Sequence, residues 1–221
     1  MVSPLLSNVF LHEVLDTWFY QCVCPRLRGR AFLVRYADDA VLGFEYEDDA
    51  RRVLAVLPKR FGKYGLTLHP EKTRLVEFRR PRRGARPIPG QSFDMLGFTH
   101  FWGRSRTGRW VVRRKTASGR LSRALQRTGR WCRVHRHERV AAQQAALNQQ
   151  LRGHYQYYGV TGNAPALATF HRQVARRWRT WLSRRSRAAH LSWEAFRRLL
   201  RHYPLAPPRV VHSMYRRAAS P

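Results

Sequence analysis

The sequence predicts an α+β fold, in which antiparallel hairpins with packed helices come first and an α-helical domain follows. Two observations support this prediction. Short runs rich in Val, Phe and Leu, typical of strands, occur before residue 115, whereas after it apolar residues recur throughout at helical spacing. The charge also changes, because residues 1–78 carry 11 basic and 10 acidic residues and residues 79–221 carry 32 basic and 3 acidic residues.

The first predicted elements are a helix and a hairpin. Apolar residues at helical spacing give Pro4–Val23 a wide apolar face, so we expect a helix that is mostly buried. Ala31–Ala37 and Ala40–Glu45 are two short apolar runs with Asp38 and Asp39 between them. This pattern predicts a hairpin that carries the acidic pair at its tip.

An amphipathic helix and two short strands come next. Apolar residues at helical spacing predict a helix over Asp48–Tyr64, which Pro58 kinks or interrupts and Gly65 ends. Two acids at the start of this helix would be favoured by the helix dipole. Short strands are expected at Thr67–Leu68 and Thr73–Phe78.

A second hairpin and the helical part complete the chain. Phe93–His100 and Arg109–Arg114 should pair as strands about a turn at Arg104–Gly108. The remaining pattern predicts helices at roughly 117–137, 139–158, 164–187, 192–202 and 207–217. Pro, Gly and Arg cluster in Arg79–Gln91 and indicate a module boundary. We therefore expect three regions, which are residues 1–79, a basic linker and hairpin at 80–115, and a helical domain at 116–221.

The composition restricts the partners. Lys and Arg number 43 and Asp and Glu 13, a net charge of +30 that requires a polyanion and makes nucleic acid the expected ligand. Three Cys without paired spacing argue against a disulfide framework and a zinc site, and favour a reducing cytoplasm. No apolar run is long enough to cross a membrane, and the start lacks the pattern of a signal peptide.

Two features allow both a functional and a structural interpretation. Asp38 and Asp39 between two apolar strands are suited to holding Mg²⁺ for phosphoryl transfer, although adjacent Asp residues also occur in solvated turns. Aromatic residues lie among the arginines of the helical part, where they could stack on bases or anchor a helical core. The second group comprises Trp131, Tyr155, Tyr157, Tyr158, Trp178, Trp181 and Trp193.

Five motifs in the same order resemble those of reverse transcriptases, in the form typical of bacterial group II intron proteins. Tyr36-Ala37-Asp38-Asp39 resembles the active-site box of that family. The others resemble the preceding palm helix, the motif after the box, the primer grip and the centre of the maturase-specific domain. They are Ser3–Leu11, Gly65–Thr73, Phe93–Phe98 and Leu151–Gly159.

The resemblance implies a partial right-hand polymerase palm followed by a thumb-like maturase domain that binds RNA. Such proteins bind their own structured intron RNA for splicing, and they copy RNA into DNA from a primer and deoxynucleoside triphosphates during retrohoming. It assigns Asp38 and Asp39 to a two-metal Mg²⁺ site. Lys72 would either protonate the leaving pyrophosphate or pair with a phosphate or carboxylate. The primer grip would be Met95, Leu96, Gly97 and Phe98, and the RNA-binding residues Arg113, Arg114, Lys115, Arg152, Tyr155, Tyr158, Arg176 and Arg177.

The chain also departs from the family pattern. The earlier palm strand with a further metal-binding Asp and the fingers domain have no counterpart, so we expect the C-terminal part of a longer or split protein. Polymerisation would then need a matching N-terminal fingers–palm fragment. The alternatives are a non-catalytic RNA-binding splicing factor, or a basic nucleic-acid-binding protein whose acidic pair is only a turn. A ribonucleoprotein or nucleoid-associated protein of the bacterial cytoplasm is the expected setting.

Overall fold

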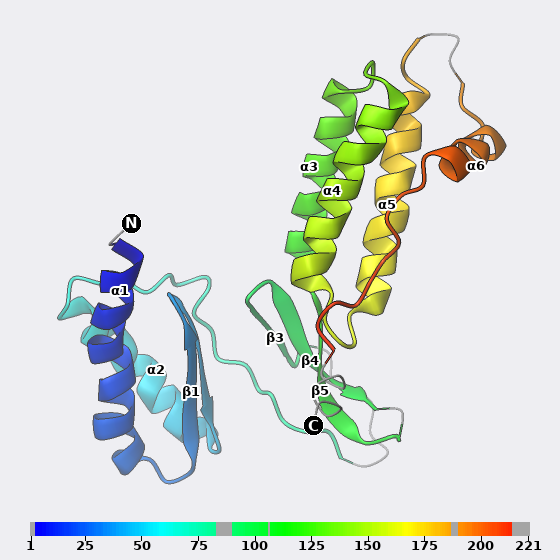
Figure 1. Ribbon diagram of the computed structural model, residues 1–221. Coiled ribbons are helices and arrows are strands. Elements are labelled where there is room, and N and C mark those ends of the chain that lie inside the picture. Colours follow the sequence, from blue (N-terminus) through cyan, green and yellow to red (C-terminus); the bar gives the residue numbers. More distant parts are fainter. Residues whose placement is uncertain (1–2, 83–89, 106, 187–189, 214–221) are drawn as a thin grey trace, which may run out of the picture. The chain divides into compact units, whose positions relative to one another are not determined.

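The computed structural model describes residues 3–82, 90–105, 107–186 and 190–213 (Figure 1). The described residues form six α-helices and small antiparallel sheets, as the predicted α+β class requires. The chain divides into two compact units, Met1–Leu96 and Gly97–Pro221. Both units are mixed in secondary structure, although the second is predominantly helical.

The first unit begins with the predicted helix, which is only partly regular. Helix α1 (Ser3–Leu11) continues into two π-helical stretches, His12–Thr17 and Phe19–Val23, and a 3₁₀ turn follows at Cys24–Arg26. Its second half is buried through four apolar side chains, whereas its first half leaves four others 42–70% exposed, so the expected burial is wrong for α1. The buried side chains are Val14, Leu15, Phe19 and Val23; the exposed ones are Leu5, Leu6, Val9 and Phe10.

The predicted hairpin and amphipathic helix are confirmed. Strand β1 (Ala31–Tyr36) pairs antiparallel with β2 (Asp39–Phe44), and Tyr36 lies opposite Asp39. Helix α2 (Glu47–Gly62) begins with three acids and runs through Pro58. Leu57 and Phe61 of α2 pack with Leu15 in one small core.

The two short strands predicted after α2 are wrong. Residues 66–69 and 73–82 have no regular secondary structure, and a turn lies at residues 70–72. The segment is held by individual side chains instead, because Leu66 and Leu68 pack on the core beneath α2. Phe78 meets Phe93 at 5.0 Å between ring centroids.

The second hairpin forms about the predicted turn, but its first predicted strand is divided into two. Strand β3 (Ser92–Met95) ends at a two-residue turn, Leu96-Gly97, which interrupts the expected strand Phe93–His100. Strand β4 (Phe98–Arg104) then pairs antiparallel with β5 (Trp110–Thr116). Both turn residues have positive φ, 52° and 76°, which a continuous strand does not permit.

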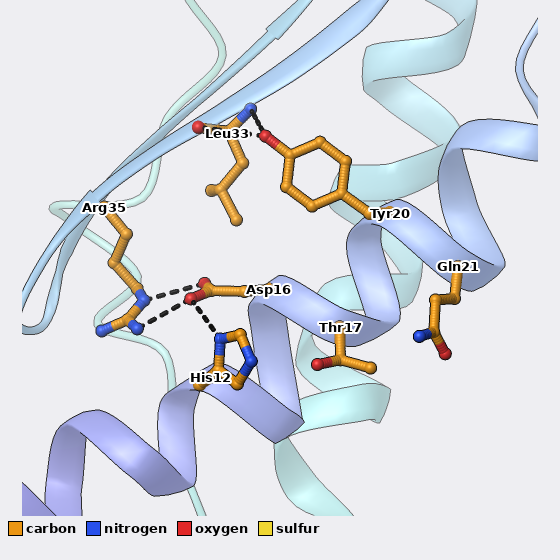
Figure 2. A pocket seen from close by; sticks show the side chains of 7 residues that line it. All are labelled: His12, Asp16, Thr17, Tyr20, Gln21, Leu33 and Arg35. Carbon is orange, nitrogen blue, oxygen red and sulfur yellow. Dashed lines mark hydrogen bonds and ion pairs between the residues drawn. The ribbon is translucent and has the colours of Figure 1, made fainter.

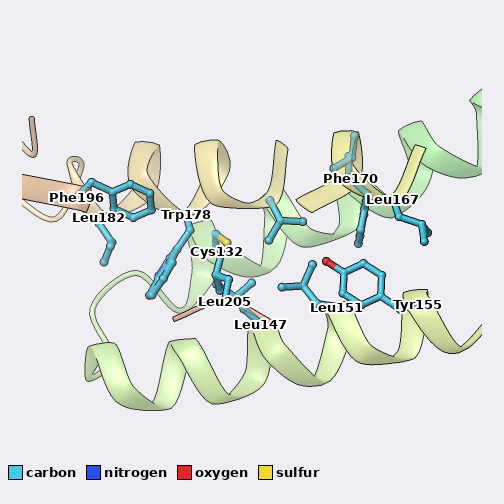
Figure 3. Packing of buried hydrophobic residues seen from close by; sticks show 12 residues of the cluster. Cys132, Leu147, Leu151, Tyr155, Leu167, Phe170, Trp178, Leu182, Phe196 and Leu205 are labelled. Atoms are coloured by element: carbon cyan, nitrogen blue, oxygen red, sulfur yellow. The ribbon is translucent and has the colours of Figure 1, made fainter. Parts of the chain in front are cut away.

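Four helices make up most of the second unit. They are α3 (Ser118–Val134), α4 (Val140–Tyr158), α5 (Ala164–Leu182) and α6 (Trp193–His202). Figure 3 shows side chains from these helices meeting in one core, with Leu147, Leu151 and Trp178 completely buried. The indole Nε1 of Trp178 donates to the side-chain oxygen of Gln143 at 2.9 Å, so the polar atom of this buried ring has a hydrogen-bond partner.

The helix predicted over residues 207–217 is wrong for residues 207–213, which are extended; the rest lies outside the described residues. Main-chain hydrogen bonds hold this segment instead, because Gly159 accepts from the N–H groups of Val211 and His212 at 2.7 and 2.8 Å. A Cβ at Gly159 would lie 2.8 Å from the Arg209 carbonyl oxygen, so the close approach requires glycine. No helix among the described residues is long and apolar enough to span a membrane.

Candidate functional site

The acidic pair lies at the tip of the β1–β2 hairpin, as predicted. Asp38 occupies the turn and Asp39 is the first residue of β2. Both side chains are exposed. Two carboxylates on adjacent residues repel each other unless a cation neutralises them, so their placement together is suited to a bound positive ion.

The turn that carries Asp38 has a strained backbone. Ala37 has φ of 53°, the left-handed conformation that a two-residue hairpin turn requires and that a residue with a Cβ rarely adopts. Among the described residues, Leu96 is the one other non-glycine with positive φ. Such strain persists only where the surroundings impose it, and it concentrates at functional sites.

Arg35, which is half-buried, holds this turn to the first helix, and Figure 2 shows its ion pair with Asp16. The guanidinium of Arg35 donates to the carbonyl oxygen of Ala37 at 3.0 Å and to the side-chain oxygen of Asn8 at 2.9 Å. It also makes a two-pronged ion pair with Asp16, with N–O distances of 2.8 and 2.7 Å. Arg35 thus connects β1, the acidic turn and the helix in one network.

The ion pair is nearly removed from solvent, with Arg35 13% and Asp16 19% exposed. The hydrogen bond from Arg35 is the main reason that the pKa of Asp16 lies below its ordinary value, and burial opposes it. This ion pair was not predicted from the sequence. A single charged residue inside the apolar run of β1 was the available signal, because an arginine on the inward face needs a partner.

A pocket of about 340 Å³ opens beside this network. It is lined by His12, Asp16, Thr17, Tyr20, Gln21, Leu33 and Arg35. The hydroxyl of Tyr20 lies 3.4 Å from both the backbone nitrogen and the carbonyl oxygen of Leu33, so it covers polar groups of β1 that do not pair with β2. Because Asp16 is committed to Arg35, the pocket offers no free carboxylate.

The residues at the turn fit Mg²⁺ by ligand type, since carboxylate oxygens are the ligands that this ion prefers. They provide two carboxylates. Within residues 3–82, 90–105, 107–186 and 190–213, no group of three or more His, Cys, Asp or Glu could hold a metal ion.

Lys72, the predicted proton donor or phosphate partner, lies in the turn after α2. Its backbone N–H donates to the carbonyl oxygen of His69 at 3.2 Å, and its side chain is exposed. Among the described contacts, no hydrogen bond or ion pair joins Lys72 to Asp38 or Asp39.

The predicted primer-grip residues lie around the second strained turn. Leu96 and Gly97 form it, and Phe98 begins β4 with its ring buried. A Cβ at Gly97 would make a tight contact with the Tyr158 hydroxyl, at 3.0 Å, and the positive φ of 76° also favours glycine here. Phe98 also stacks on Tyr157 at 6.0 Å with an interplanar angle of 13°. Gly97 and Phe98 thereby meet the end of α4.

The predicted RNA-binding residues are not all available to a ligand. Tyr155 is 3% exposed and its hydroxyl donates to the Ala206 carbonyl at 3.1 Å, so it anchors the extended C-terminal segment and the expectation of RNA contact is corrected. Burial raises its pKa above the ordinary value. Tyr158 is half-buried, with its pKa likewise raised by burial. Trp178, at 0% exposed, belongs to the core.

The predicted cationic residues differ in their surroundings. Arg152 and Arg176 are exposed on α4 and α5. Arg177 is half-buried, and its guanidinium donates to the Gln173 side chain at 3.1 Å. On β5, Arg113 and Lys115 share one face and Arg114 points to the other.

Helix α3 carries a stripe of arginines that was not predicted from the sequence. Its members are separated by three or four residues, so they share one helix face, and all are exposed. None takes part in an ion pair among the described contacts. The spacing was visible in the sequence. The stripe consists of Arg120, Arg123, Arg127 and Arg130.

The comparisons with known proteins bear on the part of the chain that contains the acidic turn. A search of curated proteins finds no match. Residues 1–100 match the family model described as reverse transcriptase (RNA-dependent DNA polymerase). The matched residues include the complete β1–β2 hairpin and the Leu96-Gly97 turn. The first 100 residues are therefore similar to a reverse transcriptase domain, that is, to an RNA-directed DNA polymerase by family.

Proposed function

We propose that the chain is the C-terminal portion of a group II intron reverse transcriptase/maturase. In this proposal the first unit supplies part of a polymerase palm, and the second unit binds structured intron RNA for splicing and retrohoming. The observation that carries the proposal is the exposed pair Asp38 and Asp39 at a strained hairpin tip, inside the segment that matches a reverse transcriptase model.

The proposed catalytic role follows from the carboxylates. Asp38 and Asp39 would hold Mg²⁺, which when bound supplies positive charge for phosphoryl transfer from a deoxynucleoside triphosphate. Arg35 would keep the turn in place through the carbonyl oxygen of Ala37. Lys72 remains a proposed proton donor or phosphate partner.

A two-metal site usually uses a carboxylate beyond this pair. Asp16 is linked to the turn through Arg35, but its carboxylate is already occupied by the ion pair with that arginine. We therefore propose that a fingers–palm fragment supplies the further carboxylate, and that polymerisation by this chain depends on such a partner.

The proposed RNA-binding role rests on charge and exposure. Residues 97–221 contain 27 Lys and Arg but only two acids, Glu138 and Glu194. The arginine stripe of α3 and exposed Arg152 and Arg176 offer guanidinium groups to phosphates, which arginine binds with two parallel hydrogen bonds. The motif Leu151–Gly159 supports the maturase assignment by its resemblance to that family.

The test separates chemistry from binding. Asp38→Asn and Asp39→Asn should abolish primer extension by the chain combined with a matching fingers–palm fragment, and leave RNA affinity within twofold. Asp48→Asn is the matched control, because Asp48 is an exposed acid that pairs with Arg28 at 2.7 Å away from the turn. Equal loss of extension in the control and the Asp38 variant would refute the assignment.

A second candidate function is RNA binding for splicing without polymerisation. The observation that favours it is the large excess of basic over acidic residues in residues 97–221. The acidic turn, by contrast, offers only two carboxylates among the described residues. Splicing assistance that survives in the Asp38→Asn variant, together with no primer extension by any assembly, would support this candidate over the first.

A further inference from the structure

The β4–β5 hairpin has one face that the core does not use. Antiparallel pairing places directly opposed residues on the same face, and the faces alternate along each strand. Phe98, Trp110 and Thr116 on one face are buried. The other face carries Phe101 of β4 with Arg113 and Lys115 of β5.

The first face already anchors the hairpin. The backbone N–H of Thr116 donates to the side chain of buried Asn163 at 2.9 Å, and the Asn163 amide donates back to the Thr116 hydroxyl at 2.8 Å. Phe98 stacks on Tyr157 from the same face. Phe101 is half-buried, and it belongs to none of the buried hydrophobic clusters of the described residues.

The second face combines an aromatic ring with cations. The ammonium of Lys115 lies 5.4 Å from the centroid of the Phe101 ring. Arg113 is directly opposite Phe101, and its aliphatic stem lies over Gly103, where any Cβ would collide with it. Both cations are exposed. A glycine at position 103 thus leaves room for Arg113 to lie along the sheet beside the ring.

The charge of this hairpin specifies the ligand. Residues 97–116 contain six Lys and Arg and no Asp or Glu, so strands β4 and β5 carry no acid of their own. An aromatic ring flanked by cations on a sheet surface is complementary to a base and its neighbouring phosphates. Paired bases in a duplex have their faces covered by stacking, whereas unpaired bases can stack on the ring.

We propose that the face formed by Phe101, Arg113 and Lys115 binds single-stranded nucleic acid. Phe101 stacks on one base, and Arg113 and Lys115 bind the adjacent phosphates. Lys115 leaves the ring face when the base enters, which its exposed and flexible side chain permits. The proposal deepens the RNA-binding function proposed above and rests on it, because it names one site and its ligand within the cationic unit.

The test uses the full-length chain with two probes, a labelled 12-nucleotide single-stranded RNA and a blunt RNA duplex of equal charge. Phe101→Leu keeps an apolar side chain but removes the stacking surface, and should weaken single-strand binding by about 5- to 150-fold. Duplex binding should change less than twofold. Phe101→Trp should retain or strengthen single-strand binding, which a purely structural role of the ring would not predict.

A charge-matched pair tests the phosphate contacts. Arg113→Gln should reduce the slope of log affinity against log salt for the single strand by about 0.7. Arg198→Gln on α6 removes the same charge from another exposed position and should leave the slope unchanged. Equal slopes for the two variants would overturn the role of Arg113.

The outcomes separate this proposal from the broader one. If the unmodified chain binds neither probe, the RNA-binding function itself fails. If it binds both and Phe101→Leu has no effect, or weakens both probes equally, the single-strand site is refuted while RNA binding stands. Circular dichroism and thermal unfolding of each variant show whether the fold is intact, and the Phe101→Trp result decides the case if Phe101→Leu lowers stability.

Discussion

Replacing Asp16 with Asn should loosen the acidic turn without altering either carboxylate in it. The substitution removes the negative partner of Arg35 while keeping the size of the side chain. Arg35, which is 13% exposed in the unsubstituted chain, then has its positive charge supported by neutral oxygens alone, those of Asn8, Ala37 and the introduced amide. Because the guanidinium fixes the Ala37 carbonyl, we expect the effect to extend from the helix to the hairpin tip.

The magnitude follows from the burial of the pair. Removing one partner of a fully buried ion pair costs about 3–5 kcal/mol. Asp16 is 19% exposed and the amide of Asn still accepts one hydrogen bond, so we expect a loss of about 2 kcal/mol in the free energy of unfolding of the first unit. For a unit of this size, that loss corresponds to a melting temperature lower by roughly 8–16 °C.

The assay is urea unfolding monitored by hydrogen exchange at individual backbone amides. This readout reports the stability of the first unit separately from that of the second unit. Glu47→Gln is the matched control, because Glu47 pairs with Arg51 while both are about two-thirds exposed. Exposed pairs of this kind contribute about 0–1 kcal/mol. Loss of protection at residues 31–44 should accompany Asp16→Asn alone. If Asp16→Asn changes stability and exchange no more than the control, the network does not hold the turn.

The pH dependence of the free energy of unfolding provides a second test of the ion pair between Asp16 and Arg35. Arg35 keeps the folded pKa of Asp16 below its unfolded value of about 3.9. The contribution of the pair is therefore complete above the unfolded pKa and is lost as the pH falls through the lower folded pKa. The acid side of the stability profile should flatten in Asp16→Asn; an unchanged profile between pH 5 and pH 2 contradicts this origin.

The remaining predictions concern the second unit. RNA affinity should fall about 10³–10⁵-fold between 50 and 200 mM salt if 6–10 phosphates are neutralised, and filter binding across salt checks this; a flat curve contradicts phosphate contacts. Trp178→Phe removes the donor to Gln143 and leaves its buried oxygen unpaired, which should lower the free energy of unfolding by about 1–3 kcal/mol in urea titrations. A change below 0.5 kcal/mol would show that the bond is unimportant.

Local patterns in the sequence predicted those helices and strands whose structure depends on residues close to one another in the chain. The β1–β2 hairpin was predictable because two apolar runs flank a short polar turn, and α2 because its apolar residues recur at helical spacing. The segment 67–78 was not, because its apolar residues mimic strands but are bound singly to other elements. Leu96-Gly97 was missed because its turn is formed by a leucine in an unusual conformation.

The candidate site shows the same limit. Asp38 and Asp39 were predictable as a motif at a hairpin tip, whereas the support from Asp16 depends on contacts nineteen residues apart. Tyr155 was misassigned because its partner, the Ala206 carbonyl, lies 51 residues away in the sequence. A residue whose role is set by a distant backbone group cannot be assigned from its own surroundings in the sequence.

The two strained turns connect fold and function in one argument. Ala37 and Leu96 have φ of 53° and 52°, and each directly precedes a residue that the proposed function uses, Asp38 and Gly97. A glycine at either position would relieve the strain, so stability alone does not account for the side chains. The surroundings impose these conformations, in the first case through the hydrogen bond from Arg35 to Ala37. The backbone of each turn is thus fixed before a ligand binds. Binding by the carboxylates, or close approach of the backbone to a ligand, then costs no further ordering of the turn.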